Sequence, residues 1–159
     1  MPVPTPSDEF VQGASTILVF EIAGSRLALN AAKVDRVCPA VAVAPLPQAP
    51  AVVEGIVDVA GTILPVFDLR RRFGWAAKPL DPSEHFVLAQ AGSRRVLIRA
   101  DRALAVSSAE VERPEAAQEC LDGLAGIARL PDGLVLIHDL AAFLSGAESE
   151  QLDVAMGAR

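Results

Sequence analysis

The sequence has few of the residues from which catalytic and metal-binding sites are usually built. Among its 159 residues are two histidines, two cysteines and one tryptophan, and there is no tyrosine. An enzyme needs a nucleophile with its base, a pair of acids or a metal cage. The cysteines, Cys38 and Cys120, lack C-x-x-C spacing, and neither histidine stands at a metal-ligand spacing from them. We therefore expect no catalytic residue, no metal and no cofactor.

The cysteines and histidines have structural interpretations instead. In a reducing compartment Cys38 and Cys120 favour buried free thiols over a disulfide. His85 and His138 each stand at the end of a strand-like run. A dyad of Cys38 and His138 is the one enzymatic alternative that these residues leave open.

Long apolar runs and a basic N-terminal region are also missing. No run approaches the ~20 residues that a membrane-spanning helix needs. The N-terminus, M-P-V-P-T-P-S-D-E, has no basic region before an apolar segment, so it does not resemble a signal peptide. The net charge of −6 argues against a nucleic-acid partner. We expect a cytoplasmic protein that neither inserts into a membrane nor binds nucleic acid.

What the sequence does contain is centred on the stretch Gly55–Gly74. Two apolar runs, Ile56–Val59 and Ile63–Leu69, flank a turn in which Gly61 accepts positive φ without strain, which predicts a β-hairpin. The arginines from Arg70 to Arg72 then change the period to that of a short helical turn. A phosphate site is possible for them, but a solvated helix face needs no special role and is the interpretation we prefer.

An internal repeat gives the architecture. Ala91-Gly92-Ser93-Arg94 repeats Ala23-Gly24-Ser25-Arg26 at an offset of 68 residues. Gly126 and Asp139 repeat the 13-residue spacing of Gly55 and Asp68 at an offset of 71 residues. Two matches in the same order predict an all-β fold of two similar barrel-like lobes.

Composition divides the rest of the chain. Residues 1–15 are rich in proline and predict a disordered leader, residues 16–144 a single domain, and residues 145–159 a polar tail. Trp75–Glu84, with Pro79 and Pro82, is expected to connect the lobes. Asp139–Leu144 predicts a short helix, and the strand that begins at Arg94 is expected to expose its arginines, Arg94, Arg95 and Arg99.

These features together resemble the CheW adaptor domain of bacterial chemosensory systems. The resemblance runs from about Thr16 to Leu144. It is carried by L-V-F-E-I-A-G-S-R-L-A-L, by K-V-D-R-V, and by G-I-V-D-V-A-G-T-I-L-P-V-F-D-L-R-R-R-F-G. The third of these is the most specific, because it keeps the G-x-x-x-x-x-G-x-x-x-P-V-x-D-L-R pattern. The resemblance implies two SH3-like, five-stranded β-barrel lobes around a shared core, with short helical turns.

The resemblance also implies partners. Members of the family couple chemoreceptors to a histidine kinase of the CheA type, contacting the kinase regulatory domain at one end and the receptor's helical tip in the groove between lobes. A module of the same fold that no longer contacts a kinase, and acts in localisation or insulation, is the alternative. The matching positions for partner binding in this sequence are Lys33, Val34, Arg36, Gly55, Asp58, Val59, Ala60 and Gly61.

Two of these positions depart from the family pattern. The turn that is commonly N-L-R-G reads Asp58-Val59-Ala60-Gly61, so its arginine is missing. Where many members have an acidic residue just after the K-V pair, this sequence has Arg36. Both departures lie in the region implied to touch partners, so we expect a specialised pathway.

Overall fold

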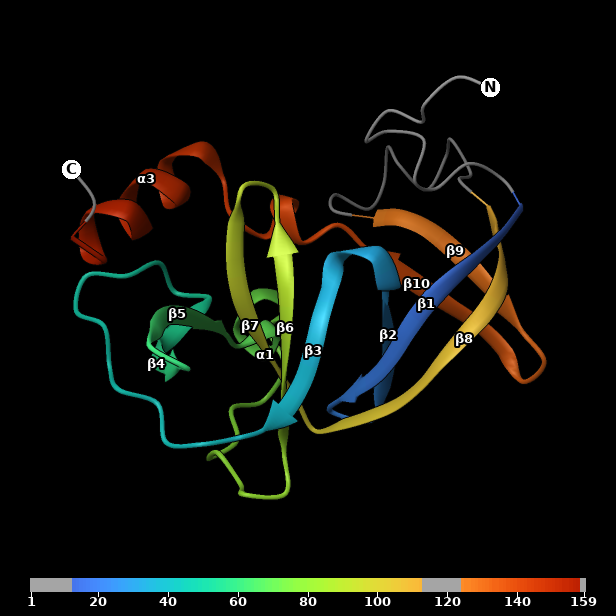
Figure 1. Cartoon of the computed structure of the whole chain (residues 1–159), viewed down its shortest axis with the longest axis horizontal. Helices are drawn as coiled ribbons and strands as arrows, with labels where there is room; N and C mark the ends of the chain where they lie inside the picture. The colour runs from blue at the N-terminus through green and yellow to red at the C-terminus, as the bar shows by residue number, and fades with distance from the viewer. Residues whose placement is uncertain (1–12, 113–123, 158–159) are drawn as a thin grey trace.

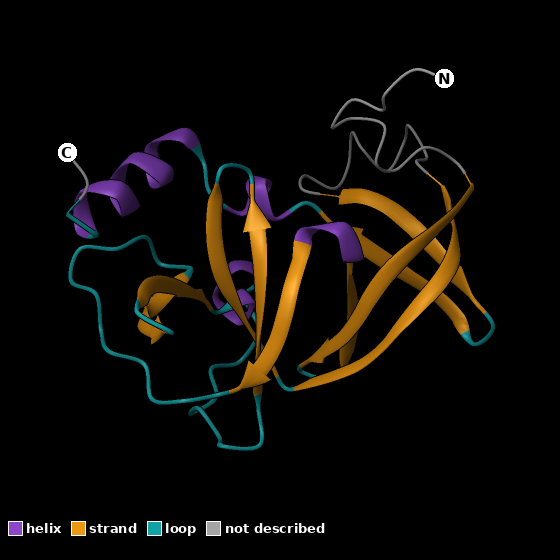
Figure 2. Cartoon of the chain, viewed as in Figure 1, coloured by secondary structure: helices purple, strands orange, loops and turns teal. Residues whose placement is uncertain are grey.

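Ten strands and four short helices form within residues 13–112 and 124–157, the part of the chain that the computed structural model describes. Figure 2 shows that strands dominate and that the helices are short. In chain order the elements are β1 (Gly13–Ile22), β2 (Ser25–Asn30), η2 (Ala31–Lys33), β3 (Val34–Pro39), β4 (Val53–Val59), β5 (Thr62–Phe67), α1 (Leu69–Phe73), β6 (His85–Ala91), β7 (Arg94–Ala100), β8 (Arg102–Glu112), β9 (Leu124–Leu130), β10 (Gly133–His138), η3 (Leu140–Phe143) and α3 (Gly146–Ala155).

The strands form two five-stranded lobes that lie side by side (Figure 1). The first, called the barrel below, is closed in the order β1-β2-β10-β9-β8. The second, called the second sheet, has the order β3-β6-β7-β5-β4. The all-β prediction with two five-stranded lobes is confirmed. None of the helices in the described part of the chain is long and apolar enough to cross a bilayer.

The internal repeat corresponds to an exchange of hairpins between the lobes. The turn at Ala23-Gly24 joins β1 and β2 of the barrel, whereas its repeat at Ala91-Gly92 joins β6 and β7 of the second sheet. The hairpin β4–β5 belongs to the second sheet, and its repeat β9–β10 belongs to the barrel. Each lobe therefore combines strands from both halves of the sequence. Parallel pairs join the halves in both lobes, β10 with β2 and β5 with β7.

This exchange corrects the expected position of the connector. Trp75–Glu84 does not join the lobes, because it links α1 to β6 and both β5 and β6 belong to the second sheet. The chain passes between lobes from η2 to β3 and again from β7 to β8. The expected leader is also shorter, since β1 begins at Gly13. Its remaining residues, 1–12, lie outside the described residues, as does Cys120.

Side-chain alternation along β1 explains how two lobes share one core. Leu18, Phe20 and Ile22 face a cluster that also contains Val87 and Ile98 of the second sheet. The residues between them point into the barrel, because successive side chains of a strand face opposite ways. That second cluster includes Ile17, Val19, Ala28, Val135 and Ile137. The two faces of β1 thus contribute to two different cores, the barrel interior and the junction between lobes.

The C-terminal polar tail contains a helix, α3, that the sequence analysis did not assign. Ser145 caps α3 by accepting from the N–H of Glu148, whose carboxylate accepts from the N–H of Ser145 in return. This capping box satisfies two N–H groups that a helix start otherwise leaves unpaired. Leu152 is fully buried in the shared core, and Arg94 bonds Asp153. The helix therefore belongs to the folded domain.

The chain between β3 and β4 passes directly over Gly55. Ala44 and Ile56 exchange backbone hydrogen bonds of 3.0 and 2.8 Å. A Cβ on Gly55 would overlap the carbonyl of Ala44 and come within 2.7 Å of Val43 Cγ1. Gly55 is buried and is not among the positive-φ glycines. Bulk is thus excluded by a contact inside the protein, and a backbone need for positive φ is not the reason.

We expect Gly55→Ala to lower the free energy of unfolding by about 1–3 kcal/mol, the usual range for overpacking a tight site. Urea unfolding followed by circular dichroism measures it. Gly146→Ala is the matched control, since nothing lies within 4 Å of a Cβ there and alanine favours helix. Equal stability of Gly55→Ala and wild type would contradict the close backbone approach.

Candidate functional site

The turn between β4 and β5 presents four of the candidate residues at an exposed tip. Ala60 and Gly61 both have positive φ, 50° and 90°, the geometry of a tight hairpin turn. Asp58 Oδ1 accepts from the N–H of Gly61 at 2.8 Å, which holds the turn. Asp58, Ala60 and Gly61 are exposed and Val59 is half-buried. A residue with a Cβ is strained by about 1–2 kcal/mol at positive φ relative to glycine. Alanine at position 60 therefore keeps the backbone strain that arginine would have there.

The other candidates lie at the junction of η2 and β3. Asn30 Oδ1 accepts from the N–H of Ala32 at 3.0 Å and starts η2, of which Lys33 is the last residue. Val34 opens β3 and packs against the shared core, so it is only partly available to a partner. Arg36 is exposed on β3, just past an irregularity in the pairing with β6. Position 36 therefore presents a positive charge to the surface.

The structure does not gather all candidate residues at one point. β3 and β4 stand at opposite ends of the strand order of the second sheet. Arg36 lies on β3, and Ala60 lies in the turn that follows β4, so the two charge departures belong to different edges. The chain that connects these edges, residues 40–52, is the one that crosses Gly55. Gly55 itself is covered and offers a partner no exposed side. Exposed candidates are thus divided between two edges of one lobe.

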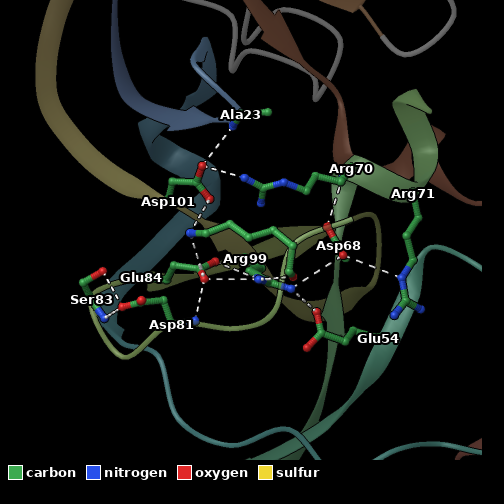
Figure 3. A network of polar contacts seen from close by, with 11 residues as sticks. Ala23, Glu54, Asp68, Arg70, Arg71, Asp81, Ser83, Glu84, Arg99 and Asp101 are labelled. Atoms are coloured by element: carbon green, nitrogen blue, oxygen red, sulfur yellow. Dashed lines mark hydrogen bonds and ion pairs between the residues drawn. The ribbon is translucent and has the colours of Figure 1, made fainter. Parts of the chain in front are cut away.

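A buried group of charges that the sequence did not reveal lies behind β4 (Figure 3). Arg99, on β7, is 3% exposed, so the expectation of an exposed arginine is wrong. Its guanidinium donates to Glu84 at 2.6 Å, to Glu54 at 2.8 Å and to the carbonyl of Lys78 at 2.8 Å. Asp68 lies 3.7 Å away. We call Arg99, Glu84, Glu54 and Asp68 the buried charge cluster.

Opposite charges favour the ionised forms of Glu84 and Arg99. Burial alone would raise the pKa of Glu84, but hydrogen bonds from Arg99 and from the N–H of Asp81 outweigh it and the net pKa is lowered. Burial alone would lower the pKa of Arg99, but hydrogen bonds and charge attraction from Glu84 and Glu54 outweigh it and raise that pKa. Asp68 also caps α1 by accepting from the N–H of Arg70. The cluster thus positions β4, α1 and the loop before β6 around one cation.

A second ion pair connects the lobes. Arg70 Nη2 donates to Asp101 Oδ2 at 2.6 Å, and the N–H of Ala23, in the β1–β2 turn, donates to the same oxygen at 2.9 Å. Asp101 lies where the chain leaves the second sheet for the barrel. Arg70 is 3% exposed, so the solvated-face interpretation is wrong for this arginine. Arg71 and Arg72 are exposed, as expected.

The side chains weighed for catalysis are not assembled into a site. Cys38 lies on β3 and donates weakly to the carbonyl of Phe86, whereas His138 ends β10 in the other lobe. The His138 ring lies beside Phe73 and Phe143, with centroid distances of 5.7 and 5.9 Å, and Trp75 packs on Phe73 at 4.8 Å. Burial lowers the pKa of His138 to about 4. Among the described residues no group of three His, Cys, Asp or Glu side chains is placed to hold a metal ion.

Comparison with known proteins agrees with this arrangement. The family model described as CheW-like domain matches residues 16–148. The chain therefore belongs to the CheW-like domain family. It is 27% identical over 146 residues to the probable chemotaxis protein CheW of Rhizobium etli, covering 87% of this chain and 93% of that protein. The crystal structure of the scaffolding protein TtCheW from Thermoanaerobacter tengcongensis shares the fold, with a TM-score of 0.76 and 23% identity over 86% of this chain and 96% of that one.

We expect Arg99→Met to lower the free energy of unfolding by about 3–5 kcal/mol, because it leaves the carboxylate of Glu84 buried without its cation. Chemical denaturation measures the loss. Arg95→Met is the matched control, since Arg95 pairs with Asp35 on the surface and exposed pairs contribute about 0–1 kcal/mol. Adding Glu84→Gln to Arg99→Met should recover part of the loss. Equal effects of the two single arginine variants would contradict the cluster.

His138 should make stability depend on pH between about 6.5 and 4. Its folded-state pKa is about 4 and its ordinary value is 6.5, so the unfolded chain takes up the proton first as pH falls. The full contribution is present above pH 6.5 and is lost toward pH 4, by about 1–3 kcal/mol. Unfolding of wild type and His138→Phe between pH 7 and 4.5 measures it. Parallel curves for the two proteins would contradict a neutral, buried His138.

Proposed function

We propose that this protein is a non-enzymatic adaptor that couples chemoreceptors to a CheA-type histidine kinase in the cytoplasm. The observation that carries the proposal is the CheW-like domain match, which spans residues 16–148 and so nearly the whole described fold. The names of the relatives, a chemotaxis protein and a scaffolding protein, support the same role. The scattered positions of the cysteine and histidines give no support to an enzymatic alternative.

The kinase regulatory domain, in this proposal, docks on the edges of the second sheet. Within the described residues β3 pairs only with β6, and the tip of the β4–β5 hairpin projects beyond its ladder. Arg36 and Ala60 are both exposed there. The receptor's helical tip takes the groove between lobes. Binding to receptors would place the protein at membrane arrays without inserting it.

The two charge departures set the choice of partner. Interface charges mostly govern specificity and encounter rate, while apolar contacts hold the complex. A kinase matched to the usual pattern would find no positive charge at position 60. At position 36 it would find a positive charge where the pattern has a negative one. The buried charge cluster and the shared core do not include either residue. The departures can therefore alter recognition without altering the fold, as a specialised pathway requires.

We expect the double variant Ala60→Arg, Arg36→Glu to bind the regulatory domain of an ordinary chemotaxis kinase about 5- to 150-fold more tightly than wild type. This corresponds to about 1–3 kcal/mol for restored charge contacts. Titration calorimetry with the full chain measures it. Position 60 already has positive φ with a Cβ, so arginine adds no new backbone strain there.

Arg102→Glu is the control for a general charge effect. Arg102 is exposed on β8 in the barrel, with 65% of its side chain accessible. Its replacement by glutamate changes the net charge by the same amount as Arg36→Glu. It should leave affinity for the kinase domain unchanged. If wild type already binds as tightly as the double variant, the specialised-pathway proposal fails. If neither protein binds any kinase regulatory domain, the alternative of a CheW-like module without a kinase partner is favoured.

A further inference from the structure

A cavity of about 420 Å³ lies at the junction of α1 and the barrel, and none of the partner-binding candidates lines it. Its volume falls in the range of small-molecule sites, roughly 300–1,000 Å³. Phe73 and Trp75 form one wall, and strands β2, β9 and β10 form the other. The lining residues are Ser25, Arg26, Leu27, Phe73, Trp75, Leu124, Leu136 and His138.

The aromatic residues of the protein are concentrated beside this cavity. The whole chain has six phenylalanines and one tryptophan. Three of these seven, Phe73, Trp75 and Phe143, form one group with His138. Phe73 is 37% exposed, although its ring lies 4.8 Å from that of Trp75. Because aromatic rings favour offset or edge contacts at 4.5–7 Å, this wall can receive a further planar ring.

The charges around the cavity favour an uncharged ligand. The guanidinium of Arg26 is paired with Asp132 at 2.9 Å, so its charge is already balanced. His138 is neutral at pH 7 because burial lowers its pKa to about 4. A neutral imidazole offers one donor and one acceptor, and the Ser25 hydroxyl offers both. A ligand with one hydroxyl or N–H group would find a polar contact here.

A second cavity of the same volume shows that these properties are particular to the site. It lies between the loops beside β4 and is lined by Ala40, Val41, Ala42, Val43, Glu54, Leu80, Asp81 and Pro82. It has no aromatic ring, and two carboxylates border it. Equal volume with different chemistry makes this cavity the internal comparison.

We propose that the cavity between α1 and the barrel is a binding site for an uncharged, planar aromatic compound that carries a single hydrogen-bonding group. The ring lies against Phe73 and Trp75, its apolar edge faces Leu124 and Leu136, and its polar group reaches Ser25 or His138. No covalent step is involved. The lining of the cavity includes neither Arg36 nor Ala60, the two residues on which the proposed choice of kinase depends.

The test uses 2-naphthol, a neutral bicyclic ring with one hydroxyl, and the ¹⁵N-labelled full chain. Trp75 is the one tryptophan in the sequence, so its indole N–H gives a single signal beside the cavity. We expect a saturable shift of this signal with a dissociation constant below about 1 mM, the range open to a compact fragment. Nuclear Overhauser contacts from naphthol protons to the methyl groups of Leu124 and Leu136 should locate it.

Three comparisons decide the proposal. Phe73→Ala, at a partly exposed position, should weaken binding at least about tenfold, while Val41→Ala in the comparison cavity should leave it unchanged. Saturated decahydro-2-naphthol should bind several-fold more weakly than 2-naphthol. A linear, unsaturated shift, contacts to other methyl groups, or equal binding of the saturated compound would overturn the proposal. None of these measurements involves a kinase or receptor, so their failure leaves the adaptor proposal untouched.

Discussion

The structure depends on one buried cation. Arg99 draws Glu84, Glu54 and the carbonyl of Lys78 onto a single guanidinium. Glu54 lies on β4, whereas Lys78 and Glu84 lie in the segment between α1 and β6. Desolvating such charges is expensive unless every one is matched. The main effect of the cluster is therefore to select one arrangement of these segments, and its net contribution to the free energy of folding is smaller. Another packing of the same segments would leave a charge unpaired.

The same logic extends from the second sheet to the barrel. Asp68 lies 3.7 Å from Arg99 and also caps α1, which presents Arg70 to Asp101. Asp101 in turn holds the β1–β2 turn. A polar chain thus runs from β4, whose hairpin carries the exposed candidates Asp58, Ala60 and Gly61, to the first turn of the other lobe (Figure 3). The apolar shared core lies beside it, so orientation and cohesion come from different residues.

Local patterns predicted the elements, and long-range pairing decided what the elements build. The turn at Gly61, the β4–β5 hairpin and the helical turn after Asp68 followed from residue types that tolerate few conformations. The repeat was correctly taken as two lobes, but nothing local shows that β2 pairs with β10 and not with β3. Arg99 was expected to be exposed, which is wrong. Strand alternation shows which side of a sheet a residue faces, but it does not show that the carboxylates of Glu84 and Glu54 lie on that side. The capping box at Ser145 was visible in the sequence and would have revealed α3.

The exchange of hairpins between lobes orders events during synthesis. The second sheet is one continuous segment, β3 to β7, whereas the barrel needs β1 and β2 together with β8 to β10. Gly13 of β1 pairs with Val111 of β8, so a nascent chain exposes the apolar faces of β1 for most of its elongation. Loop closure over such separations slows folding. On the ribosome the second sheet can form first, and the barrel can close only when its last strands have emerged. The N-terminal hairpin, β1 and β2, is therefore the segment that a chaperone would have to protect.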